Sequence, residues 1–154
     1  MSHIEVIKKF FTSLQEKKGD VLLSCYAPDA VFSDPLHGLL DAEMLFKKWH
    51  LFLEQAQELE LTYGPITVLD DEYFTSDWAM SYAKSPMGKK LKVKLKGKSF
   101  FRLKDLQIIE HSDAYRFSTL IAQTHGWKGY WLGWTGYMKR KVKLEALEEL
   151  NVEH

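Results

Sequence analysis

The feature that most constrains the fold is a long alternation of apolar and charged residues in the second half of the chain. Between residues 91 and 103 most odd positions are apolar, and between residues 90 and 104 most even positions are lysine or arginine. A period of two is typical of a β-strand that buries one face and exposes the other. Gly97 interrupts the pattern, which indicates a bulge or a sharp bend. A polar turn and a second strand-like run follow, so we predict a long antiparallel hairpin over residues 89–115.

The register of this hairpin decides which side chains face the core, because a slip of one residue turns every side chain to the other face. A three-residue loop makes three cross-strand pairs, Leu103 with Ile109, Phe101 with His111, and Ser99 with Asp113. A loop of two or four residues instead turns Glu110 and Ser112 inward. The turn holds no glycine or asparagine that would fix its type, so the pattern alone leaves both registers open.

The rest of the chain predicts helices that precede strands. Ser2 and Glu5 fit the capping box of a first helix, and Asp41 caps a longer helix over residues 42–56. Between them we expect a short helix that carries Tyr26 and ends at Pro28, and then a brief strand at residues 30–33. Two further strands are expected at residues 58–69 and 77–84. This order predicts an α+β fold in which helices cover one side of a strongly bent antiparallel sheet.

Composition excludes several classes of protein. The 154 residues are enough for one domain with its own core, and 21 basic residues balance 21 acidic ones, so no overall charge favours nucleic acid or a membrane. The lone Cys25 cannot form an internal disulfide, and no cysteine–histidine cluster indicates a metal. No long apolar run predicts a signal peptide or a membrane span. We therefore expect a cytoplasmic protein that uses no metal or other cofactor.

The order of elements, with AVFSDPLHG at residues 30–38 and IIEHSDAY at residues 108–115, resembles the SnoaL-like and ketosteroid-isomerase-like members of the nuclear transport factor 2 superfamily. The resemblance covers residues 4–124, and we place the cone domain at residues 1–126. It implies a bent sheet wrapped around a deep apolar pocket, and a homodimer through the outer face of the sheet near Phe100. It also favours the register that turns His111, Asp113 and Tyr115 inward.

The resemblance implies catalytic roles for two carboxylates. The aspartate before proline that acts as the general base of the isomerases falls on Asp34, and the late-strand aspartate of SnoaL-like cyclases falls on Asp113. The tyrosine and the protonated aspartic acid of the isomerase oxyanion hole fall on Phe10 and Ser99, so this electrophilic pair is lost. The Asp-Arg-Asp pattern of limonene epoxide hydrolases is not met either, because Gly97 and Ser99 stand at two of its positions.

Each candidate residue also has a purely structural interpretation. Asp34 precedes a proline, where an aspartate often only accepts backbone hydrogen bonds in a turn. Asp113 lies in a half-buried strand with His111 on the same face, so the two form either an acid–base pair, in which the histidine tunes or shuttles a proton, or a structural brace. We expect the ligand-binding residues to be Tyr82, Ser99, Phe101 and Tyr115. Trp49 is assigned to the core, and His37 to the surface or a loop.

The C-terminal extension, residues 127–154, combines tryptophans and tyrosines with a basic run at residues 139–143. One interpretation is a helix that packs its aromatic residues on the domain or across a dimer. The other is an anchor on an anionic membrane surface, or a lid for an amphiphilic substrate. Glutamates at positions 145, 148 and 149 cancel much of the basic charge, which disfavours the anchor.

Three functions are compatible with these patterns. The first is acid–base chemistry of the isomerase, cyclase or hydratase type on a small, mainly apolar carbonyl or hydroxyl compound, with Asp34, Asp113 and His111 as the catalytic residues. The second is binding of a small apolar or amphiphilic, lipid-like molecule without turnover. The third is a structural module. A carboxyl group with a raised pKa inside an observed pocket would favour the enzyme over the binding protein.

Overall fold

The computed structural model of the chain describes residues 1–85, 88, 90–116, 143–144, 146–148 and 150. The helices are α1 (His3–Gln15), α2 (Gly19–Ser24) and α3 (Ala42–Gln55). The strands are β1 (Tyr26–Asp34), β2 (Gly38–Leu40), β3 (Gln57–Tyr63), β4 (Thr67–Val68), β5 (Tyr73–Lys84), β6 (Leu91–Lys104) and β7 (Gln107–Tyr115). Most of the aromatic and basic segment of the C-terminal extension lies outside the described residues.

Local capping fixes where the two long helices begin. The Ser2 hydroxyl accepts a hydrogen bond from the Glu5 backbone, and the Glu5 carboxylate accepts one from the Ser2 backbone, which is the predicted capping box. Asp41 accepts a hydrogen bond from the Met44 backbone and caps α3 as predicted. Tyr26 is not helical but is the first residue of β1. Among the described residues, none of the helices has the length and apolarity needed to cross a bilayer.

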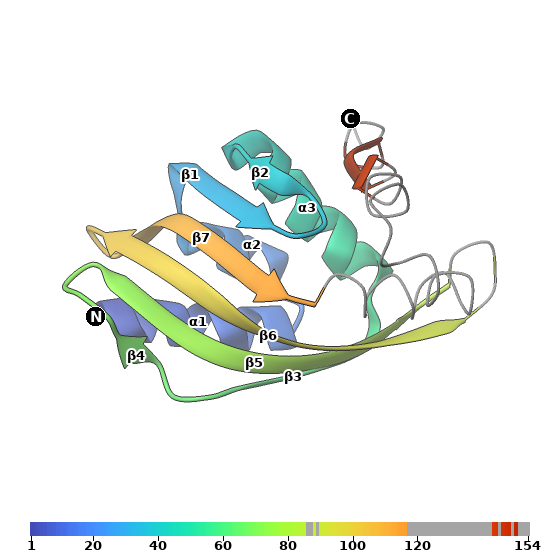
Figure 1. Cartoon of the computed structure of the whole chain (residues 1–154), viewed down its shortest axis with the longest axis horizontal. Helices are drawn as coiled ribbons and strands as arrows, with labels where there is room; N and C mark the ends of the chain where they lie inside the picture. Colours follow the sequence, from blue (N-terminus) through green and yellow to red (C-terminus); the bar gives the residue numbers. More distant parts are fainter. Residues whose placement is uncertain (86–87, 89, 117–142, 145, 149, 151–154) are drawn as a thin grey trace.

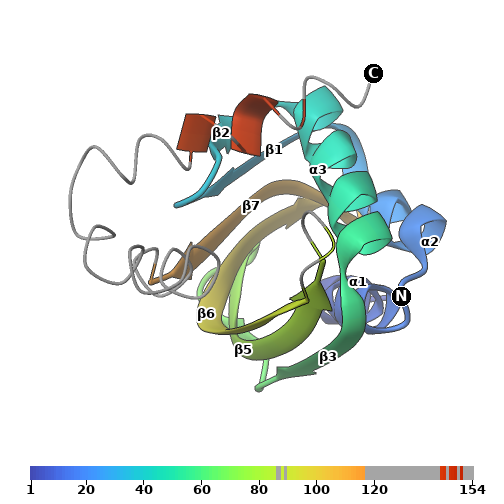
Figure 2. The same cartoon turned by 90° about the vertical axis from the view of Figure 1, so that its right-hand side faces the viewer.

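The strands form one strongly curved sheet in the order β2-β1-β7-β6-β5-β3, with β4 paired to β5 (Figure 1). Helices α1 and α3 cover its concave side (Figure 2), so the predicted α+β fold with a bent sheet is confirmed. One pairing differs from the prediction, because β1 runs parallel to β7. Strands joined by a tight turn must be antiparallel, whereas β1 and β7 are separated by all the elements from β2 to β6, which leaves their relative direction free.

The hairpin between β6 and β7 reaches the predicted register by a different route. Its loop has two residues, Asp105 and Leu106, both with positive φ (53° and 63°), as in the turns that match the twist of paired strands. Leu103 therefore faces Ile108, and the predicted pairing with Ile109 is wrong. Ile109 is then an extra residue in β7, a β-bulge. Beyond the bulge the predicted pairs are present, Phe101 with His111 and Ser99 with Asp113.

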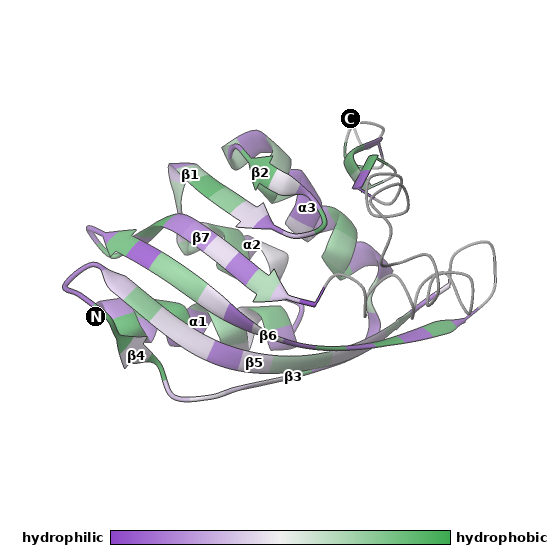
Figure 3. Cartoon of the chain, viewed as in Figure 1, coloured by the Kyte–Doolittle hydropathy of each residue, from purple (hydrophilic) through white to green (hydrophobic). Residues whose placement is uncertain are grey.

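The apolar face of the sheet builds the core together with the helices. Hydrophilic and hydrophobic residues alternate along the long strands (Figure 3), and Val93, Phe101 and Leu103 of β6 are buried. Gly97 marks no bulge, since it pairs directly with Trp78 of β5. A Cβ at Gly97 would lie 2.5 Å from the Trp78 ring and 2.6 Å from the Ala114 carbonyl oxygen. The glycine is thus required by the indole that lies against it.

Candidate functional site

A cavity of about 220 Å³ lies between the concave face of the sheet and the helices α1 and α3. Aromatic and aliphatic side chains of both helices and of β3, β5 and β6 form most of its wall. Its polar lining includes Asp34, Lys48, Tyr82, Ser99, Asp113 and Tyr115. The cavity therefore combines a mainly apolar wall with a small set of convergent polar groups, the usual composition of a small-molecule site.

Asp113 is held in this lining by hydrogen bonds from two side chains. Its Oδ1 accepts hydrogen bonds from the Ser99 hydroxyl at 2.5 Å and from His111 Nε2 at 2.7 Å. Its Oδ2 accepts no hydrogen bond from a described residue, and Asp113 lines the cavity. Burial raises the pKa of the Asp113 carboxyl, but His111, Lys48 and Ser99 together outweigh burial and hold that pKa below its ordinary value. Asp113 is therefore a carboxylate at neutral pH.

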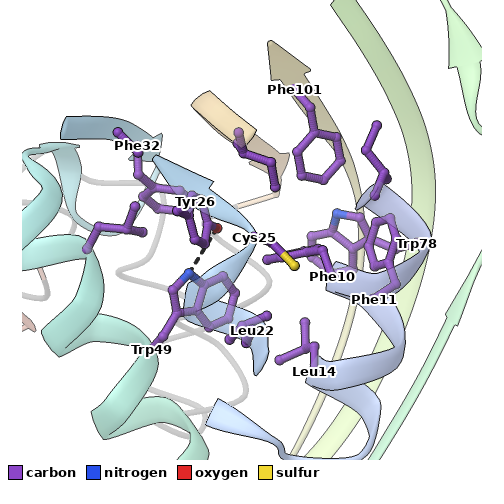
Figure 4. Close-up of a cluster of buried hydrophobic side chains, with 14 of the residues drawn as sticks. Phe10, Phe11, Leu14, Leu22, Cys25, Tyr26, Phe32, Trp49, Trp78 and Phe101 are labelled. Carbon is purple, nitrogen blue, oxygen red and sulfur yellow. Dashed lines mark hydrogen bonds between the residues drawn. The ribbon is translucent and has the colours of Figure 1, made fainter. Parts of the chain in front are cut away.

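His111 lies behind Asp113 and does not line the cavity. It is only 2% exposed, and its ring packs on those of Phe32 and Phe101 at centroid distances of 5.0 and 4.5 Å. Its Nδ1 lies 2.7 Å from the Tyr26 hydroxyl, which accepts a hydrogen bond from Trp49 Nε1 at 3.0 Å (Figure 4). His111 is thus bonded at both ring nitrogens inside an aromatic shell.

Asp34 has the predicted turn chemistry and also lines the cavity. Its Oδ1 accepts a hydrogen bond from the His37 backbone at 2.6 Å, and His37 Nδ1 lies 3.2 Å from both carboxylate oxygens. Burial raises the pKa of the Asp34 carboxyl, but His37 and the charge of Lys48 together lower it by more than burial raises it. The pKa of Asp34 is therefore below its ordinary value. His37 lines the cavity. It lies in the turn between β1 and β2, which agrees with its assignment to the surface or a loop, but its ring contacts Asp34 and is partly buried.

Lys48 is a charged cavity residue that sequence reasoning missed, and Lys84 is another. Lys48 projects from α3 with its Nζ 3.6 Å from the centre of the Trp49 ring and 4.1 Å from that of Phe32. Burial lowers the pKa of the Lys48 ammonium group, and the charges of Asp34 and Asp113 partly oppose this shift. A signal was present in the sequence, since position 48 follows Leu45 by three and precedes Phe52 by four, on the apolar stripe of the helix.

The other predicted ligand-binding residues divide into two groups. Tyr82, Ser99 and Tyr115 line the cavity, and burial raises the pKa of Tyr82 to about 12. Phe101 does not line it, since it is 1% exposed and stacks on His111 behind the wall. The prediction that His111 and Phe101 project into the cavity with Asp113 is therefore wrong, although all three lie on the concave face. The sheet bends so strongly that the helices cover this part of that face directly.

Two described residues from the C-terminal part also line the cavity. Ala146 and Leu150 line it, and Leu150 is fully buried. No cluster of three or more histidine, cysteine or acidic residues in the described part of the chain is arranged to hold a metal. The described polar groups of the cavity lining are carboxylates, the ammonium groups of Lys48 and Lys84, hydroxyls, indoles, an amide and an imidazole.

The sequence matches the SnoaL-like domain over residues 7–111. The chain belongs to the SnoaL-like family. Comparison of the sequence with curated proteins finds no match. The family assignment rests on more than half of the chain and covers α1 through most of β7, so it includes every element that builds the cavity except the end of β7 and the C-terminal residues.

Solved structures show the same fold in this SnoaL-like protein. A candidate polyketide cyclase from Silicibacter has a TM-score of 0.68 at 19% identity, covering 79% of this chain and 94% of that one. A candidate isomerase from Bacillus subtilis has a TM-score of 0.70 at 15% identity, covering 82% and 97%. An epoxide hydrolase of the limonene epoxide hydrolase type from M. tuberculosis has a TM-score of 0.62 at 15% identity, covering 99% and 96%. At these identities the likeness establishes the fold alone.

Proposed function

We propose that this SnoaL-like protein catalyses proton transfer of the isomerase or cyclase type on a small, mainly apolar carbonyl compound. The observation that carries the proposal is the Asp113 carboxylate, whose Oδ2 accepts no hydrogen bond from a described residue, in a mainly apolar cavity that Lys48 also lines. A base needs an ionised carboxylate with a free oxygen, and an enolate needs a nearby positive charge or hydrogen-bond donor. Both groups line the same cavity.

In the proposed reaction the carboxylate of Asp113 takes a proton from a carbon next to the substrate carbonyl. The electron pair of the C–H bond moves to the carbonyl oxygen, and the Lys48 ammonium group stabilises the resulting enolate. In a β,γ-unsaturated substrate Asp113 then returns the proton to the γ carbon. The enolate re-forms the carbonyl group and the carbon–carbon double bond moves to the position next to it, so no proton or electron is gained or lost. Lys48 supplies the electrophile that Phe10 and Ser99 do not supply.

The pKa directions assign a base rather than an acid to this site. The pKa values of the Asp113 and Asp34 carboxyls both lie below their ordinary range, so neither group is a proton donor at neutral pH. The raised carboxyl pKa that would have distinguished an enzyme from a binding protein is not present. A carboxylate stabilised as an anion is also a weaker base. This observation favours a second candidate function, binding of a small apolar ligand without turnover.

Cavity size limits the ligand in both cases. A cavity of about 220 Å³ exceeds the roughly 150 Å³ that takes up benzene in an engineered core, and it suits a compound with one or two rings. β-Tetralone, a bicyclic ketone with acidic protons next to its carbonyl group, is a suitable probe. The exchange of these protons needs no cofactor and reports the first step of the proposed reaction directly.

The experiment measures exchange of the α-protons of β-tetralone in D₂O by proton NMR. We expect the protein to accelerate exchange. Asp113→Asn should lower the rate by about 10²–10⁴-fold, the range for a general base, and Lys48→Met by about 10²–10³-fold, the range for one oxyanion donor. Lys104→Met, which removes an exposed lysine at the end of β6, is the control and should leave the rate unchanged.

Two outcomes would contradict the enzymatic proposal. Saturable quenching of tryptophan fluorescence by the ketone, with exchange at the uncatalysed rate, would establish the binding function instead. Exchange that survives Asp113→Asn would show that another group is the base. Equal rates for Lys48→Met and the wild type would remove Lys48 from the mechanism and leave the base assignment intact.

A further inference from the structure

A row of buried polar groups extends from α3 through β1 to the cavity. Trp49 Nε1 donates to the Tyr26 oxygen at 3.0 Å, Tyr26 lies 2.7 Å from His111 Nδ1, and His111 Nε2 lies 2.7 Å from Asp113 Oδ1. Trp49, Tyr26 and His111 are each at most 5% exposed. Buried networks of this kind are stable only when every donor and acceptor is matched, so the direction of each bond can be worked out.

The two ends of the row fix its direction. The indole of Trp49 can only donate, and the ionised carboxylate of Asp113 can only accept. His111 therefore donates through Nε2–H to Asp113, and its neutral form accepts at Nδ1. Tyr26 accepts from Trp49 and donates its own proton to His111 Nδ1. In this arrangement every group in the row is satisfied.

A protonated His111 leaves one group of the row unmatched. Its Nδ1–H would donate to the Tyr26 oxygen, which can accept from both His111 and Trp49, but the Tyr26 hydroxyl proton would lose its acceptor. The neighbouring rings of Phe10, Phe32 and Phe101 offer no acceptor to either group. Among the described residues, the groups hydrogen-bonded to His111 are Tyr26 and Asp113 alone. A buried hydroxyl without a partner costs about 1–3 kcal/mol, and this cost opposes the attraction that the Asp113 carboxylate, 2.7 Å away, would exert on a protonated ring.

We propose that Tyr26, oriented by Trp49, holds His111 as the neutral tautomer with its proton on Nε2, which makes His111 a fixed hydrogen-bond donor to Asp113 and not a carrier of the substrate's proton. The first part concerns the free protein alone, and the second rests on the proposed function. Tyr26 is then a positioning residue, since it does not line the cavity. The proton taken from the substrate stays on Asp113 Oδ2 until it is returned.

The tautomer can be read in the free protein by long-range proton–nitrogen NMR of histidine labelled with ¹⁵N, at neutral pH. Contacts between its ring protons and those of Phe10, Phe32 and Phe101 identify His111. We expect one protonated nitrogen, Nε2, and one unprotonated nitrogen, Nδ1, shifted to lower frequency by the hydrogen bond from Tyr26. Two nitrogens of the imidazolium type, or a proton on Nδ1, would overturn the proposal without any variant being made.

Variants separate the contribution of Tyr26 from that of Asp113. In Asp113→Asn the amide could either donate to or accept from Nε2, so the carboxylate no longer dictates the tautomer. We expect the Nε2–H form to persist there because Tyr26 still donates to Nδ1. Adding Tyr26→Phe should then give averaged signals from both tautomers. A shift to the Nδ1–H form in Asp113→Asn alone would show that Asp113, and not Tyr26, sets the tautomer.

Trp49→Phe is the second variant, for the case in which the double variant does not fold. It keeps an aromatic ring in α3 and removes the N–H that orients Tyr26. Combined with Asp113→Asn it should also give averaged signals, whereas an unchanged Nε2–H form would exclude the orienting role of Trp49. Because these spectra need no substrate, they assign the tautomer of His111 even if the protein does not turn over β-tetralone. Failure of the proton-transfer proposal and failure of the tautomer proposal are therefore distinguishable.

Discussion

Replacing Asp113 with asparagine should destabilise the protein, although it removes a buried charge. Asparagine keeps an acceptor for Ser99 and His111, whose hydrogen bonds to Asp113 are 2.5 and 2.7 Å long. Bonds to a charged group contribute about 1.5–3 kcal/mol and neutral ones about 0.5–1.5 kcal/mol, so the lost charge costs about 1 kcal/mol per bond. Relief of the burial penalty offsets part of this cost. Because the carboxyl pKa lies below its ordinary value, the interactions outweigh burial.

We therefore expect Asp113→Asn to lower the free energy of unfolding by about 1 kcal/mol, and Tm by about 2–4 °C for a domain of this size. The effect should depend on pH in a defined direction. A folded-state pKa below the unfolded value of about 3.9 gives stabilisation that is complete above that pH and is lost as the pH falls through the lower, folded-state value. Below about pH 4 the Tm of wild type and variant should converge.

Thermal unfolding followed by circular dichroism at a series of pH values measures both effects. Asp77→Asn is the matched control, since Asp77 lies on β5 with 77% of its side chain exposed, and its Tm should hardly change. An Asp113→Asn protein as stable as the wild type, or more stable, would refute the reasoning from hydrogen bonds and charge. A Tm difference that stays constant into acid would refute the link to ionisation, even if the sign were correct.

Three further changes test the fold and the assembly. Gly97→Ala should lower the free energy of unfolding, measured in urea, by about 1–3 kcal/mol, because the added Cβ would lie 2.5 Å from the Trp78 ring. Gly64→Ala is the control and should have little effect, because its Cβ would lie no closer than 3.7 Å to another atom. Leu150→Ala should cost about 2–5 kcal/mol and admit larger ketones, in contrast to Leu144→Ala, whose side chain is 54% exposed. Phe100 is 41% exposed beside an outer groove of about 290 Å³ and should be buried in a homodimer. Phe100→Lys should therefore give a monomer in analytical ultracentrifugation. A monomeric wild type would exclude the dimer.

Local patterns in the sequence predicted much of the fold. The alternation around Val93 and Leu95 located β6, and the caps at Ser2 and Asp41 located α1 and α3. These features depend on neighbours in the chain, so a single sequence contains them. The parallel pairing of β1 with β7 depends on contacts far apart in the chain. It was not predictable from periodicity.

The sequence predicted only those parts of the candidate site that follow from local patterns in the chain. Asp113 and Ser99 follow from strand alternation once the register is fixed. Lys48 was missed because a lysine on a helix is usually exposed, and only its position on the apolar stripe distinguishes it. Tyr26 was missed because it was assigned to a helix, while its partner His111 lies in the last strand of the sheet. Two residues that meet only through tertiary structure give no signal of that contact in the sequence.

The bulge at Ile109 allows a two-residue loop to give the cross-strand pairs that a three-residue loop would give without a bulge. A two-residue loop with a bulge and a three-residue loop without one both place Ser99 opposite Asp113. Deleting Ile109 should therefore conserve the site, because the pair Leu103–Ile108 would be followed directly by Arg102–Glu110 in a regular ladder. A relative of this protein can thus lose one residue here without turning Asp113 away from the cavity, provided that the bulge is lost with it. A change of one residue in the length of this hairpin should be found together with gain or loss of the bulge.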